Sequence, residues 1–454
     1  MSNDPVPGLL SRATELLESE FAALPPFQRD DNQESMARVL ADVAHRLADN
    51  YPYFHPLYAG QMLKPPHPLA RAAYALAMAI NPNNHARDGG RASSEMEIEA
   101  VRHIAAIFGW SQFLGHLASS GTIANLEALW IAGQTCPGRR IVGSSQAHYT
   151  HQRISGVLKL DYSAIPADHC GRMSMEHLEA ELRKGDVGTV VATMGSTAIG
   201  AVDPLDQILA LRKKYGFRVH VDAAYGGYFA LIPELLGEPA RRAFAAIGLA
   251  DSIVIDPHKH GLQPYGCGCV LFRNPDVGRY YKHDSPYTYF TSKQLHLGEI
   301  SLECSRAGAA AVALWATQQL LPSVPKGEFA RGLAQGRAAA LDLDCRLRAD
   351  ARFEPLADGG SELDIVVWKL KAAHAEEASH LAQAAFDACA ARGLHLALVQ
   401  LPLNWFSPAG EDVSVPDENL VTCLRSVLMK PEHKAWLDTI WDRLSAACTD
   451  VNAE

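Results

Sequence analysis

From about residue 95 the sequence alternates helix-like stretches with short runs that are almost entirely apolar. These runs lie at residues 140–143, 189–193, 218–221, 252–255 and 269–272. Continuous apolar runs rich in Val and Ile are typical of strands that are buried on both faces. Because the runs alternate with helices, they predict an α/β fold with a mostly parallel central sheet flanked by helices. In such sheets ligands bind at the carboxyl ends of the strands.

The sequence on either side of this region has a different pattern. Apolar positions at helical spacing predict helices within residues 6–50, and a Pro-rich, aromatic segment follows at 51–68. Pro322, Pro325 and Gly327 interrupt the chain after a helix-like stretch at 307–321. Beyond them we expect strands at 363–370 and 394–401, and helices near 375–392 and 434–448. The sequence therefore predicts an N-terminal helical segment (1–90), a large domain (91–325) and a small C-terminal α+β domain (326–454).

Composition narrows the class of protein. The 454 residues carry a net charge of −10 without a basic run, which argues against nucleic-acid binding. The nine cysteines are odd in number and show no regular spacing, which argues against a disulfide framework. Cys267 and Cys269 lie close together, but no second pair of cysteines follows at the spacing of zinc ligands. We therefore expect reduced thiols and no metal site. The first residues do not resemble a signal peptide and no apolar run is long enough to span a bilayer, so we expect a cytoplasmic protein without a membrane partner.

Two motifs offer contacts for a planar, phosphorylated ligand. Ser119, Ser120, Gly121 and Thr122 precede a helix-like stretch. Free backbone N–H groups and the helix dipole at such a start can hold a phosphate, although the same residues suit an ordinary helix N-cap. His148 follows the apolar run at 140–143 and could stack on a flat ring or be purely structural.

Two further motifs supply an acid and an amine. Asp222 ends the run at 218–221, and a carboxylate there needs a partner, which a pyridinium N–H would provide. Ala224 is small enough to let a ring lie flat. Lys259 follows the run at 252–255, where burial and nearby charge can free its amine as a nucleophile. The alternatives are a helix-capping Asp222 and a surface Lys259.

Together these motifs match the phosphate, ring face, ring nitrogen and aldehyde of pyridoxal 5′-phosphate (PLP). The sequence resembles the PLP-dependent group II amino-acid decarboxylases of fold type I, the aromatic-L-amino-acid, tyrosine and glutamate decarboxylase type. The resemblance covers roughly residues 50–320 and rests on SSGTIANLEAL (119–129), SSQAHYT (144–150), VVATMGSTAIGAVDPL (190–205), VHVDAAYGG (219–227) and DPHKHG (256–261). The form DPHKHG is also similar to archaeal tyrosine or aspartate decarboxylases and to sphingosine-phosphate lyases.

The resemblance implies a role for each matching position. Lys259 would carry PLP as a Schiff base, Asp222 would pair with the ring nitrogen, and His148 and Ala224 would pack on opposite ring faces. Ser120, Gly121, Thr122 and His258 would hold the phosphate. Ser196 and Thr197 would lie near the cofactor or substrate.

The resemblance also implies a reaction and an assembly. The reaction is decarboxylation of an L-amino acid to an amine and CO₂, with a loop tyrosine returning a proton; Tyr287 and Tyr289 in the segment 282–292 are the candidates. The family works as a homodimer with the active site at the subunit interface. We therefore expect the N-terminal helices to pack on a second copy of the chain.

Several alternatives stay open at the level of sequence. A PLP-dependent carbon–carbon lyase or aldehyde-forming enzyme would use the same cofactor residues, and a PLP-binding protein without catalysis is a third reading. Arg306 and Arg425 could bind a substrate carboxylate or hold structure. The aromatic segment 53–58, with Lys64, His67 and His85, could shape a substrate pocket or be ordinary packing and surface residues. The sequence does not specify which amino acid would be the substrate.

Overall fold

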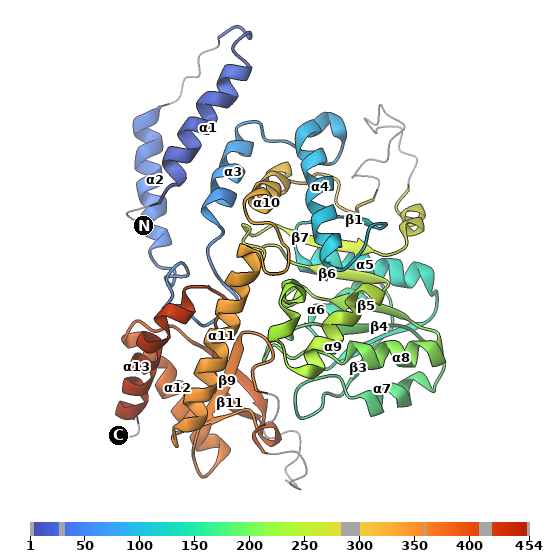
Figure 1. Ribbon diagram of the computed structural model, residues 1–454, viewed down its shortest axis with the longest axis vertical. Helices are drawn as coiled ribbons and strands as arrows, with labels where there is room; N and C mark the ends of the chain where they lie inside the picture. Colours follow the sequence, from blue (N-terminus) through green and yellow to red (C-terminus); the bar gives the residue numbers. More distant parts are fainter. Residues whose placement is uncertain (1–3, 27–31, 283–299, 358–359, 408–419, 452–454) are drawn as a thin grey trace.

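The computed structural model describes residues 4–26, 32–282, 300–357, 360–407 and 420–451. Figure 1 shows a large α/β layer, a smaller unit built from the C-terminal part of the chain, and two N-terminal helices that extend away from both. Within the described ranges, no helix is long and apolar enough to cross a membrane.

The large unit is built on a seven-stranded sheet in the order β1-β7-β6-β5-β4-β2-β3. Its strands are β1 (Leu114–Ala118), β2 (Arg140–Ser144), β3 (Tyr162–Ile165), β4 (Val187–Thr193), β5 (Arg218–Asp222), β6 (Ser252–Ile255) and β7 (Gly268–Phe272). Strands β3, β2, β4, β5 and β6 run parallel, and β7 is antiparallel to both β6 and β1. The prediction of a mostly parallel sheet is confirmed, and each of the five apolar runs is a strand.

The two strands that the sequence did not reveal are the edge strands of this sheet. β3 is only partly buried, and β1 contains Gly115 and His116, so neither is a continuous apolar run. The imidazole of His116 is buried, and the loss of its contact with water is offset by a hydrogen bond between its Nε2 atom and Oε2 of Glu127 at 2.8 Å. An edge strand needs less apolar surface than a central one, which explains why the pattern is weak there.

Helices cover both faces of the large sheet. They are α4 (Arg91–Ile107), α5 (Gly121–Thr135), α6 (Thr150–Val157), α7 (Met175–Leu182), α8 (Leu205–Tyr215) and α9 (Glu238–Ala246). α10 (Gly308–Leu320) packs on both α4 and α3 (Pro68–Met78), and α3 in turn contacts α1 (Val6–Glu20). These contacts join the N-terminal segment to the large unit.

The smaller unit is a four-stranded antiparallel sheet in the order β10-β11-β9-β8. The strands are β8 (Phe353–Pro355), β9 (Ile365–Leu370), β10 (Ala397–Pro402) and β11 (Leu420–Val427), and the helices beside them are α11 (Glu328–Ala349), α12 (Ala375–Ala391) and α13 (His433–Val451). The predicted strands and helices of this part are all present. β11 was not predicted, because the polar Thr422, Arg425 and Ser426 interrupt its apolar pattern.

A close backbone approach fixes the turn after β5. The N–H group of Gly226 donates a hydrogen bond to the carbonyl oxygen of Met194 at 3.0 Å. A Cβ atom at position 226 would lie only 2.1 Å from that oxygen. The turn that follows Asp222 can therefore sit against the end of β4 only if residue 226 has no side chain.

We predict that Gly226→Ala lowers the free energy of unfolding by about 2–3 kcal/mol, because the backbone around Met194 must shift. The matched control is Gly156→Ala in α6, where an added Cβ meets no atom within 4 Å. Since Ala favours a helix over Gly, the control should be neutral or up to about 1 kcal/mol more stable. Urea unfolding of the two variants measures the difference, and equal stabilities would refute the packing argument.

Candidate active site

Most of the predicted site residues converge on a cavity of about 210 Å³ at the carboxyl ends of β4, β5 and β6. Its walls come from the start of α5, the segment between β2 and α6, the ends of β4 and β5, and the turn between β6 and β7. The cavity is lined by Ser120, Gly121, Thr122, Asn125, His148, Thr150, Thr193, Gly195, Thr197, Asp222, Ala224, Tyr225, Asp256, His258 and Lys259. Residues separated by nearly 140 positions in sequence, such as Ser120 and Lys259, thus line one cavity.

The start of α5 forms one end of this cavity. The Ser120 hydroxyl oxygen accepts a hydrogen bond from the Ile123 N–H at 3.3 Å, so Ser120 is also an ordinary helix N-cap. The N–H groups of the first turn have no acceptor within a helix, which leaves those of Gly121 and Thr122 available to an anion. A Cβ at Gly121 would lie 2.5 Å from Oδ2 of Asp256, so the helix start can contact the β6–β7 turn only through glycine.

Lys259 lies in the turn between β6 and β7 beside two other polar residues. Its Nζ atom is 3.1 Å from Oδ2 of Asp256, and Nε2 of His258 is 3.5 Å from the same oxygen. Nδ1–H of His258 donates to the carbonyl oxygen of Cys267 at 2.7 Å, and burial lowers the pKa of the imidazole. The amine of Lys259 is therefore held inside the cavity by a buried carboxylate rather than exposed on a surface turn.

Asp222 ends β5 and is hydrogen bonded on both oxygens. Nε2 of His151 lies 2.7 Å from Oδ2, and the Ala224 N–H donates to Oδ1 at 3.1 Å. Burial alone would raise the pKa of the Asp222 carboxyl, but the hydrogen bond from His151 and the charge of Lys259 hold it well below its usual range. Asp222 is therefore a permanent anion facing the cavity.

His151 is a site residue that the sequence analysis missed. It is fully buried in α6, three positions after His148, and its Nδ1 atom has no hydrogen-bond partner among the described residues. His148 precedes α6, and the His151 N–H donates to its carbonyl oxygen at 3.0 Å, so the spacing of three residues brings both histidines into one turn at the start of the helix. That spacing was the available signal.

The remaining predicted residues divide into three groups. His148 and Ala224 both line the cavity, and Nδ1 of His148 is 2.8 Å from the Thr150 hydroxyl. Thr197 lines the cavity, whereas Ser196 is buried outside the lining, where its hydroxyl oxygen accepts from the Ala201 N–H at 3.0 Å. Tyr287 and Tyr289 lie outside the described residues.

Other lining residues were not singled out in the sequence. Asn125 is one helical turn after Gly121, and its Oδ1 atom is 2.8 Å from Nε2 of His220. Thr193 is the last residue of β4 and Gly195 follows two positions later, so the rule that located Asp222 would also have located them. Asp256 belongs to the motif around Lys259, but the pattern of residues did not predict that its carboxylate would contact the Lys259 amine.

The two arginines that the sequence left open differ clearly. Nη1 of Arg306 is 2.6 Å from Oε1 of Glu97 and donates to the carbonyl oxygen of Leu117, so Arg306 holds α4 to β1. Arg425 is buried in β11, and its guanidinium donates to the carbonyl oxygens of Thr197, Ala198 and Gly60 and to Oε1 of Gln61. Within the described part of the chain, no carboxylate lies within 4 Å of Arg425.

The polar groups that line the cavity are suited to bind PLP, and some of them have no hydrogen-bond partner in the protein. Oδ1 of Asp256 and Oγ1 of Thr193 are buried without a hydrogen-bond partner in the described residues, so the cavity walls have unused polar capacity. The helix start suits a phosphate, Asp222 suits a protonated ring nitrogen, and Lys259 supplies an amine. Asp256 adds a negative charge close to the helix start, which Lys259 balances at 3.1 Å.

Comparison with known proteins agrees with this geometry. The pyridoxal-dependent decarboxylase conserved domain matches residues 135–371, slightly more than half of the chain. The chain belongs to the pyridoxal-dependent decarboxylase family. PLP is therefore the cofactor of this chain.

Individual relatives of this decarboxylase-family chain are distant. It is 29% identical to an L-tyrosine decarboxylase of Enterococcus faecium over 64% of each chain. It is 32% identical to a probable L-tyrosine/L-aspartate decarboxylase of Methanothrix thermoacetophila over 55% of this chain and 63% of the relative. Each match thus spans less than two thirds of the relative. The structure of Oryza sativa TDC with PLP and tryptamine superposes with a TM-score of 0.77 at 18% identity, covering 99% of this chain and 98% of that one. At that identity the likeness concerns the fold, which is that of a PLP-dependent decarboxylase of fold type I.

We predict that His151→Phe destabilises the protein without PLP by roughly 1–3 kcal/mol, because the buried Asp222 carboxylate loses its strongest donor. The affinity for PLP should fall as well, since a less firmly ionised Asp222 pairs less well with a ring nitrogen. Urea unfolding and a PLP titration followed by absorbance measure the two effects.

The control for this variant is His380→Phe, an exposed position of α12 that should change stability by less than about 0.5 kcal/mol. If His151→Phe were as stable as the control and bound PLP equally well, His151 would have no part in holding Asp222.

Proposed function

We propose that this protein decarboxylates an L-amino acid to the corresponding amine and CO₂. The observation that carries the proposal is the shared cavity, in which the Lys259 amine and the ionised Asp222 carboxylate face one space beside a phosphate-binding helix start. When bound, PLP would supply a conjugated pyridinium ring that accepts the electrons released as CO₂ leaves. The remaining chemistry belongs to residues of this chain.

Each residue has a defined task under this proposal. Lys259 would hold the cofactor covalently through its amine. Asp222, fixed by His151, would keep a proton on the ring nitrogen, which preserves the electron-accepting ability of the ring. His148 and Ala224 would contact the ring, and the half-buried His148 would help to exclude water from the bond that breaks. Tyr287 and Tyr289 remain the candidates for returning a proton to the substrate carbon.

The position of Arg425 is an argument for a substrate with a short, acidic side chain. Its guanidinium has five N–H groups, of which four donate to neutral acceptors, and no described carboxylate lies within 4 Å of it. It binds the Thr197 carbonyl, and Thr197 lines the cavity, so a substrate carboxylate near Thr197 would meet a buried positive charge. The tyrosine and tyrosine/aspartate decarboxylases among the relatives make L-aspartate and L-tyrosine the first substrates to test, and Arg425 favours aspartate.

We predict that Lys259→Ala lowers kcat by at least about a thousand-fold and removes the visible absorption of the bound cofactor, because the covalent link is lost. Asp222→Ala should retain weak PLP binding and lose roughly a hundred-fold in kcat. The control is Lys213→Ala, an exposed position on α8.

The assay is CO₂ release and amine formation from the common L-amino acids by the PLP-loaded protein. Amine and CO₂ in equal amounts would support the decarboxylase. An aldehyde product would favour instead the carbon–carbon lyase or aldehyde-forming activity that the same cofactor residues permit. Wild-type turnover by Lys259→Ala would refute both readings.

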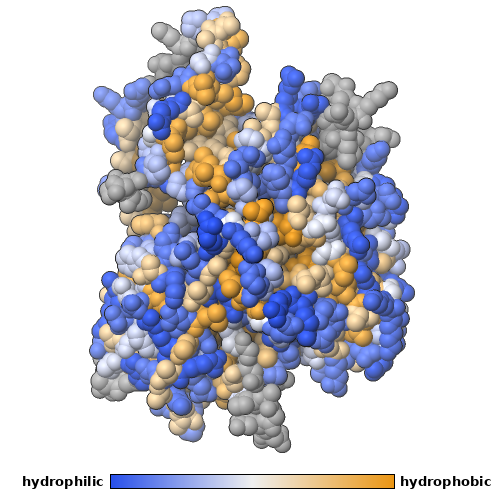
Figure 2. All heavy atoms as spheres, in the orientation of Figure 1, coloured by the Kyte–Doolittle hydropathy of each residue, from blue (hydrophilic) through white to orange (hydrophobic). Residues whose placement is uncertain are grey.

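We also propose that the protein is a homodimer with a shared active site. No residue of α1 or α2 (Gln33–Leu47) is buried in the single chain. On α2 an apolar stripe at helical spacing is exposed, formed by Met36, Val39, Leu40, Val43 and Leu47. Apolar side chains are visible along these projecting helices in Figure 2. A second copy of the chain would cover this surface.

We further propose a cytoplasmic location. The nine cysteines are all free, which is consistent with a reducing compartment.

Replacing both Val39 and Leu40 by Glu should shift the protein from dimer to monomer in sedimentation experiments, because four buried carboxylates would lie in the interface. The matched control is His45→Glu on the opposite face of α2, which should leave the dimer intact. A monomeric wild-type protein, or a double variant that sediments as a dimer, would contradict this assembly.

A further inference from the structure

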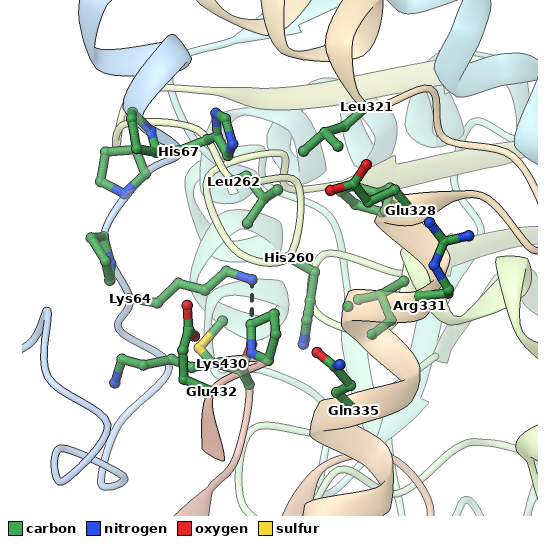
Figure 3. Close-up of a pocket in the computed structure, with 18 of the residues that line it drawn as sticks. Lys64, His67, His260, Leu262, Leu321, Glu328, Arg331, Gln335, Lys430 and Glu432 are labelled. Carbon is green, nitrogen blue, oxygen red and sulfur yellow. Dashed lines mark hydrogen bonds between the residues drawn. The ribbon is translucent and has the colours of Figure 1, made fainter. Parts of the chain in front are cut away.

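A second cavity, of about 670 Å³, lies on the other side of the turn that carries Lys259. It is formed by residues 64–68, the first turns of α11 and residues 429–432, and it shares no lining residue with the cofactor cavity (Figure 3). Part of its wall is apolar, including Leu262, Phe329, Leu333 and Met429. Its size is in the range of pockets that enclose small organic molecules.

Lys64 supplies an incompletely paired charge in this cavity. Its side chain extends into the space in Figure 3, and Nζ donates to one acceptor, the carbonyl oxygen of Met429 at 3.3 Å. An ammonium group has three N–H donors, and no carboxylate of the described residues lies within 4 Å of it. Burial lowers the pKa of Lys64 to about 8. A ligand carboxylate would therefore replace hydration that this amine has lost.

His67 adds a second donor to the same space. Its Nδ1 atom accepts a hydrogen bond from the Leu69 N–H at 3.1 Å, so the neutral ring carries its proton on Nε2. Lys430 also has one hydrogen-bond acceptor, the Tyr58 carbonyl oxygen at 2.5 Å, but its amine lies in addition over the Tyr58 ring, 5.2 Å from the ring centre. The two acids among the lining residues, Glu328 and Glu432, are exposed. Glu432 and Glu328 add negative charge in the neighbourhood of Lys64 and His67 respectively, but neither is paired with these two donors within 4 Å, so both keep unused N–H groups.

We propose that this cavity binds a small organic carboxylate. The carboxylate contacts Lys64 and His67, and the apolar part of the ligand lies against Leu262, Phe329 and Met429.

A buried hydrogen-bonded network connects this cavity to the cofactor cavity. His260, which follows Lys259, lines the second cavity, and its Nε2 atom is 2.8 Å from Oδ2 of Asp364. The Tyr225 hydroxyl donates to Oδ1 of the same carboxylate at 2.5 Å, and Tyr225 lines the cofactor cavity. Burial opposes the ionisation of Asp364, whereas His260, Tyr225 and the charge of Lys64 favour it and lower its pKa. A ligand that neutralises Lys64 therefore changes the field on a group that both cavities share, and we expect the two sites to be coupled.

Calorimetric titration of the PLP-loaded protein with phenylacetate tests the site, and phenylacetamide is the uncharged control ligand. We expect phenylacetate to bind, phenylacetamide to bind at least about tenfold more weakly, and Lys64→Met to abolish the difference. Lys259→Ala should still bind phenylacetate, because Lys259 belongs to the other cavity. No binding by the wild type, or binding kept by Lys64→Met and lost by Lys259→Ala, would overturn the proposal.

A second variant tests the cavity without changing its charge. Gly332 lines the space from α11, and an added Cβ meets only Cγ of Pro431, at 3.3 Å. Gly332→Leu should therefore fold, fill the cavity and weaken phenylacetate binding at least about tenfold. Unchanged binding by a folded Gly332→Leu protein would place the ligand elsewhere.

Coupling is tested by measuring the dissociation constant of phenylacetate with and without PLP. Because linkage is reciprocal, PLP should change the affinity for phenylacetate by the same factor as phenylacetate changes the affinity for PLP, and we expect about fivefold or more. Equal dissociation constants would refute the coupling. None of these measurements uses turnover, so their failure is distinguishable from a failure of the proposed decarboxylase activity.

Discussion

Asp222 is a carboxylate placed at the end of a strand that is buried on both faces, and the site is arranged around the need to keep it charged. Water does not solvate it, so the protein must supply the compensation. His151 donates to one oxygen, the backbone of Ala224 donates to the other, and Lys259 adds a positive charge nearby. The outcome is a fixed anion that favours a protonated ring nitrogen, which is the property that a PLP enzyme requires of this position.

The connection from β6 to β7 places the amine. A parallel neighbour of β6 would have required a long crossover connection, usually a helix, whereas the antiparallel β7 allows a short return across the end of the sheet. That return carries Asp256, His258 and Lys259 over the cofactor cavity, and its other side, through His260 and Leu262, forms a wall of the second cavity. One turn therefore separates two spaces, and the His260–Asp364–Tyr225 network crosses it.

Much of the fold and the site could be predicted from local patterns. The five central apolar runs identified five strands, because strands buried on both faces leave a clear signal in sequence. The same rule located Asp222 and Lys259 at strand ends. The edge strands β1 and β3 and the strand β11 gave no such signal, since partial burial and polar residues break the apolar pattern. Lys64 and His67, considered for a substrate pocket, lie in a cavity separate from that of the cofactor.

Sequence by itself determined the parallel sheet, the family and most of the residues that line the smaller cavity, because each depends on residues that are close together in the chain or on a rule that holds for every α/β sheet. Only the tertiary structure decided which partners those residues have. His151 meets Asp222 across 71 positions, Asp364 meets His260 across 104, and Arg425 meets Thr197 across 228. Such pairings arise from the packing of the sheet, its helices and the C-terminal unit against one another, and no local pattern of residues encodes them.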